Sequence, residues 1–176
     1  HVAFLKNLGG PSWITIEGKD RTRRRVVVTL LHGNEPSGLH AVHRLLKEGV
    51  QPETDLGILV AAADAALYEP ILSHRYIPGE QDLNRCFRSP YTTNQGELAA
   101  KILDIIHDFN PEGLIDTHNT SSHSEAFSIA AHKTIENAGL ASLFTDSLII
   151  LDQNLGTLLE KLDSSIPAIT VEFGGF

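Results

Sequence analysis

Three side chains in the sequence have the types and the placement to hold a metal ion. His32 and Glu35 stand three residues apart where an apolar run ends, and His118 ends another segment that is expected to form a strand. Two imidazoles and one carboxylate are a common set of protein ligands for a catalytic zinc ion, with the fourth position left to water. The sequence therefore predicts one Zn2+ per chain, held by His32, Glu35 and His118.

The His-x-x-Glu spacing alone does not establish such a site. Pairs with this spacing occur by chance in surface turns, and the chain has nine histidines, most of which must have other roles. The only cysteine, Cys86, excludes a cysteine-rich structural zinc site. It also excludes an internal disulfide, which favours a cytoplasmic compartment.

Strands must position the candidate ligands, and the pattern of hydrophobic residues indicates where these strands lie. Buried strands are expected at 26–31, 56–62, 113–118 and 168–173, with shorter ones at 126–130 and 147–151. Helices are expected at 39–46, 97–109, 132–143 and 155–162. Residues 14–17 are expected to form a β-hairpin with 26–31. Strands that alternate with helices predict an α/β domain with a mixed or largely parallel central sheet.

Four clusters of polar residues fall at the ends of these strands or in the long irregular stretch 63–94. They are 32–35, 82–85, 116–119 and Glu172. In open α/β sheets, ligands bind beyond the carboxyl ends of the strands, and a long loop in a small domain is usually functional. The four clusters are therefore expected to form one site.

Taken together and in order, these clusters carry a family resemblance. The segments are His32-Gly-Asn-Glu-Pro-Ser-Gly38, Asp82-Leu-Asn-Arg85, Asp116-Thr-His-Asn-Thr120 and Val171-Glu-Phe-Gly174. They resemble the succinylglutamate desuccinylase/aspartoacylase family, which is related to the zinc carboxypeptidases, over about residues 26 to 174. The resemblance implies a three-layer, zinc-carboxypeptidase-like fold in which helices flank the sheet. It also implies zinc ligation by His32, Glu35 and His118.

The resemblance assigns further roles by position. It implies that Glu172 is the general base and acid, and that Asn84 and Arg85 bind a substrate carboxylate. Arg75, in Arg75-Tyr-Ile77, would help to polarise the scissile carbonyl. Asp82 would support a ligand histidine.

Each role is chemically reasonable, but each residue type also has an ordinary explanation. A guanidinium forms two parallel hydrogen bonds with a carboxylate, yet loop arginines are often solvated. Glu172 could be a strand-end carboxylate exposed to water. Asp116 is two residues before His118, so both point to the same face of an extended strand. Asp116 could therefore fix the histidine tautomer or cap the strand end.

The sequence departs from the family pattern in the stretch 156–167. Relatives that act on acidic N-acyl amino acids carry Tyr and Arg there, and this stretch has neither. The identity of the substrate is therefore open. The C-terminal β-rich domain of the family is also missing, so residues 1–176 are expected to be the zinc-hydrolase catalytic domain of a longer protein.

Charge and hydropathy exclude two classes of binding partner. The net charge of −8 and the pI of about 5.5 argue against nucleic acid, and no apolar run reaches membrane-spanning length. We expect a small carboxylated N-acyl amino acid as substrate, with a homo-oligomer possible. The alternatives are a metallocarboxypeptidase that acts on peptide C-termini and a non-catalytic zinc-binding module.

Overall fold

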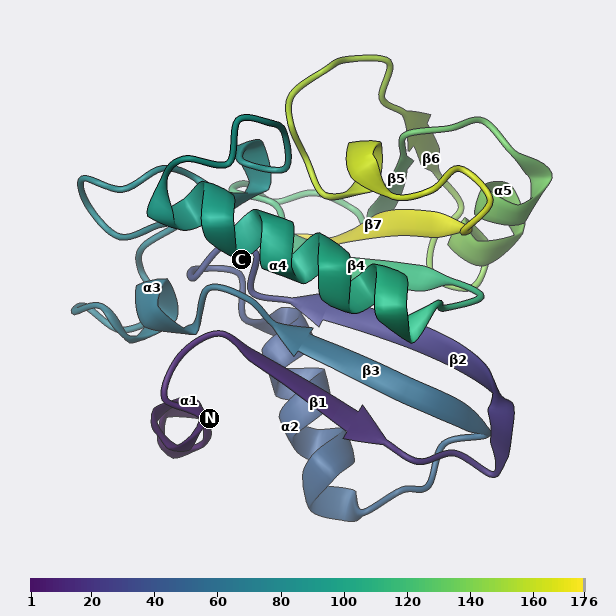
Figure 1. Cartoon of the computed structure of the whole chain (residues 1–176), viewed down its shortest axis with the longest axis horizontal. Coiled ribbons are helices and arrows are strands. Elements are labelled where there is room, and N and C mark those ends of the chain that lie inside the picture. Colours follow the sequence, from purple (N-terminus) through teal and green to yellow (C-terminus); the bar gives the residue numbers. More distant parts are fainter. Residues whose placement is uncertain (176) are drawn as a thin grey trace.

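A seven-stranded sheet runs through the computed structural model, which describes residues 1–175 (Figure 1). The strands are β1 (Ser12–Ile16), β2 (Asp20–Thr29), β3 (Thr54–Val60), β4 (Leu114–Asn119), β5 (Phe127–Ala130), β6 (Leu148–Ile150) and β7 (Ala168–Phe173). Their order in the sheet is β1-β3-β2-β4-β7-β5-β6. Neighbours pair in parallel, except for β1 with β3 and β5 with β7. The predicted mixed, largely parallel sheet is confirmed.

Helices cover both faces of the sheet and complete three layers (Figure 1). The helix α4 (Asn94–Phe109) packs on one face, where its Ile102 and Ile106 share a core with Val26 and Val28. The other face carries α1 (Val2–Leu8), α2 (Ser37–Glu48), α3 (Ala63–Leu67) and α5 (Ile135–Ala141). Short 3-10 turns at Leu83–Arg85 and Leu159–Lys161 lie in the connections. The predicted three-layer α/β fold is therefore confirmed.

The predicted hairpin is wrong. β1 pairs antiparallel with β3, with Ile14 opposite Ile58, so that β3 lies between β1 and β2. The reason is burial: β2 carries fully buried Val26 and Val28 and needs a partner strand on each side, whereas β1 is half-buried and occupies the edge.

Two predicted helices also differ from the structure. The helix expected at 132–143 spans Ile135–Ala141, because the Thr134 side chain accepts a hydrogen bond from the Asn137 amide and starts the helix there. The helix expected at 155–162 is a 3-10 turn at Leu159–Lys161. Among the described residues, no helix is both long and apolar enough to cross a membrane.

Helix α2 approaches the sheet closely through a glycine. A Cβ atom at Gly38 would lie 1.9 Å from Thr117 Oγ1 and 2.7 Å from Thr29 Oγ1, both in strands that lead into the site. Such distances are far below van der Waals contact, so any side chain here must push α2 away from β2 and β4.

We expect Gly38→Ala to lower the free energy of unfolding by about 1–3 kcal/mol, as measured by urea denaturation. Gly139→Ala is the matched control, because Gly139 is also helical and its added Cβ would meet nothing within 4 Å. The control should match the parent or exceed its stability by up to about 1 kcal/mol. A Gly38→Ala variant as stable as the parent would show that the close approach is unimportant.

Candidate metal centre

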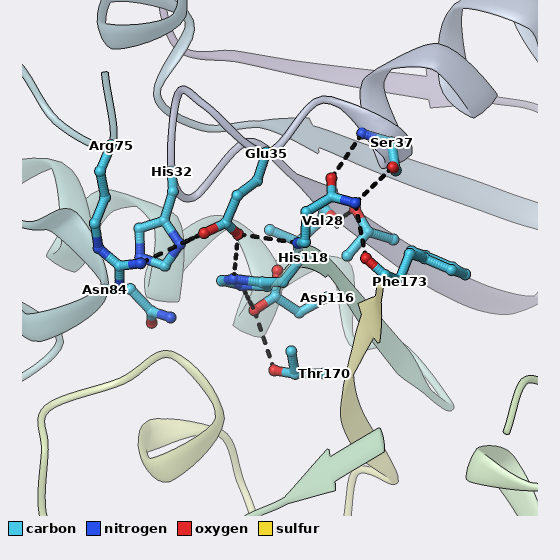
Figure 2. Close-up of polar contacts among 12 residues, drawn as sticks. Val28, His32, Glu35, Ser37, Arg75, Asn84, Asp116, His118, Thr170 and Phe173 are labelled. Atoms are coloured by element: carbon cyan, nitrogen blue, oxygen red, sulfur yellow. Dashed lines mark hydrogen bonds and ion pairs between the residues drawn. The ribbon is translucent and has the colours of Figure 1, made fainter. Parts of the chain in front are cut away.

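The ends of β2 and β4 bring three potential ligands together. His32 follows β2, Glu35 stands in the next turn, and His118 lies near the end of β4; all three are buried. Their ligand atoms lie within 4.8 Å of one another. Figure 2 shows Glu35 between the two histidines, with His32 Nδ1 3.0 Å from Glu35 Oε1 and His118 Nδ1 2.8 Å from Glu35 Oε2. We call these three residues the metal trio.

The backbone around His32 is shaped to turn this side chain into the site. Leu30 has a φ of 55°, a left-handed conformation that costs a non-glycine residue about 1 kcal/mol or more and ends the strand. Gly33 then packs against two other segments: its added Cβ would lie 2.5 Å from Ala66 N and 2.7 Å from His74 O. Close packing therefore requires glycine after His32.

Each histidine of the trio has an aspartate on its other side. His118 Nε2 lies 2.7 Å from Asp116 Oδ2, and His32 Nε2 lies 3.2 Å from Asp82 Oδ1. In the neutral His118 ring, an Nε2–H that donates to Asp116 leaves the Nδ1 lone pair directed toward Glu35. This is the arrangement in which a carboxylate orients a metal-binding imidazole. Both aspartates thus lie where a supporting role requires them.

The trio fits a zinc ion by its own chemistry. The two ring nitrogens of His32 are buried and make no well-aligned hydrogen bond, although carboxylate oxygens lie close by. A buried polar atom without a partner is unfavourable, and a cation between the three residues would give His32 Nδ1 one. Two imidazole nitrogens and one carboxylate oxygen match the ligands that zinc takes in open, catalytic sites.

Electrostatics keep Glu35 ionised at this buried position. Burial alone would raise the pKa of the Glu35 carboxyl, but the contacts with His118 and His32 outweigh burial and lower this pKa to about 2. Burial would likewise lower the pKa of His118, but Asp116 and Glu35 raise it well above its ordinary value. Glu35 is therefore a carboxylate at neutral pH, the form that a metal ligand must have.

Arg75 is anchored beside the trio. Its Nε donates to Asp82 Oδ2 at 2.9 Å. Its Nη1 lies 3.4 Å from Glu35 Oε1, and Figure 2 shows these two side chains next to each other. Burial raises the pKa of the Asp82 carboxyl, but His32 and Arg75 together lower it well below its usual range. The remaining guanidinium N–H groups are available to the cavity that Arg75 lines.

Asn84 and Arg85 reach the same cavity from a short 3-10 turn. Asp82 starts this turn by accepting the Asn84 amide at 2.9 Å. Asn84 Oδ1 accepts the Leu158 amide at 3.0 Å, so the Asn84 side-chain NH2 group is left to donate. Both residues line a cavity of about 360 Å³, which the metal trio also lines.

Glu172 faces this cavity from β7, in register with His118 on β4. Its Oε2 atom is buried and makes no hydrogen bond within residues 1–175. Burial raises the pKa of the Glu172 carboxyl above its ordinary value. A partly buried carboxylate with a free oxygen and a raised pKa is suited to take up and release a proton.

Comparison with known proteins agrees with this geometry. The succinylglutamate desuccinylase/aspartoacylase catalytic domain model matches residues 22–176. The chain belongs to this family. The resemblance expected from the sequence is therefore confirmed, and the family is one of hydrolytic enzymes. No curated protein sequence matches the chain significantly.

Solved structures share the fold of this family member. A succinylglutamate desuccinylase from Chromobacterium violaceum has a TM-score of 0.76 at 20% identity and matches 92% of this chain and 56% of its own. The Vibrio cholerae desuccinylase has a TM-score of 0.75 at 17% identity, over 98% and 62% of the two chains. A metallo-carboxypeptidase from Burkholderia cenocepacia has a TM-score of 0.68 at 11% identity, over 98% and 58%. The chain thus spans little more than half the length of these relatives.

One residue that the sequence reasoning left without a role is Asn119. Its Nδ2 donates to Ser37 Oγ at 2.7 Å and to the Phe173 carbonyl at 2.8 Å, and its backbone amide lies 3.3 Å from Glu35 Oε2. Asn119 therefore joins the start of α2, the end of β7 and the carboxylate of the trio (Ser37 and Phe173 in Figure 2). Its place beside His118 in the motif was the available signal.

Asp116→Asn removes the negative charge behind His118 while it keeps nearly the same shape. We expect this variant to bind zinc about 10- to 100-fold more weakly, because the carboxylate that orients and polarises the imidazole is lost. Competition with a chromogenic chelator measures the affinity. Asp108→Asn is the control, since the Asp108 side chain is 84% exposed on α4. Equal affinity of both variants would contradict a supporting role for Asp116.

Proposed function

We propose that the chain is the catalytic domain of a zinc-dependent hydrolase that cleaves the amide bond of an N-acyl amino acid or a similar small carboxylated substrate. The observation that carries the proposal is the composition of one cavity. It combines the metal trio with the carboxylate of Glu172 and with the side chains of Asn84 and Arg85, which can donate hydrogen bonds. One Zn2+ per chain would be held by His32, Glu35 and His118.

When bound there, zinc would lower the pKa of a water molecule and polarise the scissile carbonyl. Glu172 would act as general base and then as general acid. It takes a proton from the attacking water and later delivers it to the leaving amine nitrogen. Its raised pKa and its unpaired Oε2 support both steps. Asp82 and Asp116 would hold the two imidazoles in position.

Three further residues would bind and orient the substrate. Arg85 would pair its planar guanidinium with the substrate carboxylate, and the Asn84 NH2 group would donate beside it. Arg75 would direct its remaining N–H groups at the carbonyl oxygen, where negative charge develops in the transition state. Its anchoring by Asp82 and Glu35 supports this role, because the guanidinium is already placed before substrate arrives.

The domain organisation, the cellular compartment and the oligomeric state belong to the same proposal. We propose that residues 1–176 act as one zinc-hydrolase catalytic domain, which the single sheet and its single candidate metal centre within residues 1–175 support. The reduced, buried Cys86 is consistent with a cytoplasmic enzyme. A homo-oligomer stays a prediction.

Cleavage of peptides at the C-terminus is the second candidate function. The fold match to a metallo-carboxypeptidase favours it, since Arg85 could equally bind a terminal carboxylate. The cavity volume of about 360 Å³ favours the smaller substrate, because it is near the lower end of ordinary ligand pockets. Incubation of the full-length protein with N-acyl amino acids and with peptides, followed by detection of the released amino acid, separates the two.

Variants of the trio and of Glu172 should fail in different ways. We expect His32→Ala and Glu35→Ala to lose bound zinc and hydrolysis together, because each removes a ligand. Glu172→Gln should keep its zinc while kcat falls by about 10²- to 10⁴-fold, the usual contribution of a general base. Metal content by mass spectrometry and amine release measure the two properties.

His107→Ala is the control for these variants, because His107 lies on α4 with an exposed side chain. It should keep both zinc and activity. Unchanged zinc content in the ligand variants would rule out the proposed centre. Bound zinc without turnover of any N-acyl amino acid, ester or peptide by the parent would instead point to the non-catalytic module.

A further inference from the structure

The polarity of the cavity changes along the sheet. β4 and β7 contribute polar side chains, among them Thr170 and Glu172. The next strand, β5, pairs antiparallel with β7 and places Phe127 opposite Glu172 and Ile129 opposite Thr170. Directly paired residues point to the same face of a sheet, so Phe127 and Ile129 extend the polar floor of the cavity as an apolar surface.

Other apolar residues continue this surface. We define the apolar wall as the apolar side chains that line the cavity on this side: Phe127, Ile129, Ala131, Leu151, Leu155 and Leu159. They come from β5 and the residue after it, from the residue after β6 and from the segment before β7. Leu158 donates its amide to Asn84 Oδ1, so this last segment packs directly against the turn that carries Asn84 and Arg85. The wall therefore begins beside the expected carboxylate-binding pair.

One acidic side chain, Glu160, borders the apolar wall. Its two carboxylate oxygens accept the amides of Leu155 and Gly156 at 3.0 and 2.8 Å. Glu160 thus stabilises the loop that presents Leu155, and its carboxylate oxygens face backbone amides. It still adds negative charge to this side of the cavity.

Positively charged side chains are scarce among the described residues that line the cavity. Apart from the histidines of the metal trio, the described residues that line it include two positively charged side chains, Arg75 and Arg85. Arg75 is already paired with Asp82 and Glu35. Arg85 donates to the carbonyl oxygen of Asn84 and has no carboxylate partner among residues 1–175, so it retains an unneutralised charge. The described residues can therefore compensate one substrate carboxylate, whereas a second would face the apolar wall and the carboxylates of Glu160 and Glu172.

We propose that the substrate carries a single carboxylate and an apolar group, and that this group lies against the apolar wall. The substrate class is then a monocarboxylic N-acyl amino acid whose acyl group or side chain is apolar. A dicarboxylic compound is disfavoured. The inference rests on the proposed function for the placement of the carboxylate at Arg85. It adds to that function the type of substrate group that the rest of the cavity binds.

Two matched pairs of ligands test this selection. N-acetylleucine and N-acetylaspartate differ at the side chain, and N-(4-methylpentanoyl)glycine and N-succinylglycine differ at the acyl group. Calorimetry on the zinc-loaded, full-length Glu172→Gln variant measures binding without cleavage. The substitution removes a negative charge and so favours the acidic ligands, which makes the comparison conservative. We expect the apolar member of each pair to bind about 10- to 100-fold more tightly, as expected for burial of a branched aliphatic group. Equal or tighter binding of the acidic member in either pair would overturn the inference.

A cation placed on the wall should change this preference. We expect Ile129→Arg in the full-length protein to shift the binding ratio of each pair toward the acidic member by at least about 10-fold, because it supplies a partner for a second carboxylate. Ile135→Arg is the matched control on α5, since Ile135 is 82% exposed and does not line the cavity. It should leave the ratio unchanged. If Ile129→Arg does not fold, the binding data of the preceding test decide.

Turnover by the parent enzyme keeps the two proposals separate. Cleavage of the acidic compounds in preference to the apolar ones would preserve the proposed function and overturn the single-carboxylate inference. Apolar ligands that bind more tightly, with bound zinc but no cleavage of any compound, would support the inference about the cavity and overturn the proposed hydrolase function.

Discussion

A buried carboxylate, that of Glu35, is the point on which the carboxyl end of the sheet depends. It is contacted by His32, His118 and Arg75 and by the backbone amide of Asn119. A buried charge that loses one partner typically destabilises a protein by about 3–5 kcal/mol, so these contacts are mutually dependent. The partners come from the turn after β2, from β4 and from the long loop. The negative charge of Glu35 therefore stabilises the convergence of three separate segments.

The direction of the strands determines which side of the cavity carries the metal trio and which side carries the apolar wall. β2, β4 and β7 run in parallel, so their carboxyl ends meet at one edge and bring the metal trio and Glu172 together. β5 runs the opposite way, so its first residue, Phe127, reaches this same edge. The reversal of one strand thus places apolar residues beside reactive ones. A change of residues on β5 can alter what binds without disturbing the trio.

Much of this arrangement could be predicted from sequence because it depends on local pattern. The strands expected at 26–31 and 113–118 each lie between two neighbouring strands, and the apolar residues of such buried strands stand out in the sequence. The pairing of β1 with β3 could not be read in this way, since it depends on competition among strands that are distant in sequence. The short helices α1 and α3 were not anticipated, because seven and five residues give too little periodicity.

Within the cavity, too, some residues could be predicted from the local sequence and others could not. His32, Glu35 and His118 stand out by residue type and by motif, so their convergence could be expected. Phe127 and Ile129 look like ordinary strand residues, and only the register with β7 places them beside Glu172 and Thr170. In the segment 155–162, apolar residues at helical spacing suggested a helix. Instead, Gly156 adopts a φ of 77° next to Arg85, and the leucines are divided between the core and the apolar wall.

Asp82 links the two halves of the site most directly. Its carboxylate lies 3.2 Å from His32 Nε2, accepts Arg75 Nε at 2.9 Å and accepts the Asn84 amide at 2.9 Å. The first contact orients a candidate ligand, the second places a guanidinium, and the third starts the turn that presents Asn84 and Arg85. The spacing within Asp82-Leu-Asn-Arg85 follows from this geometry, because a side chain that caps its own turn bonds the amide two residues on. The metal trio and the turn that carries Asn84 and Arg85 are therefore not independent, because one carboxylate contacts both.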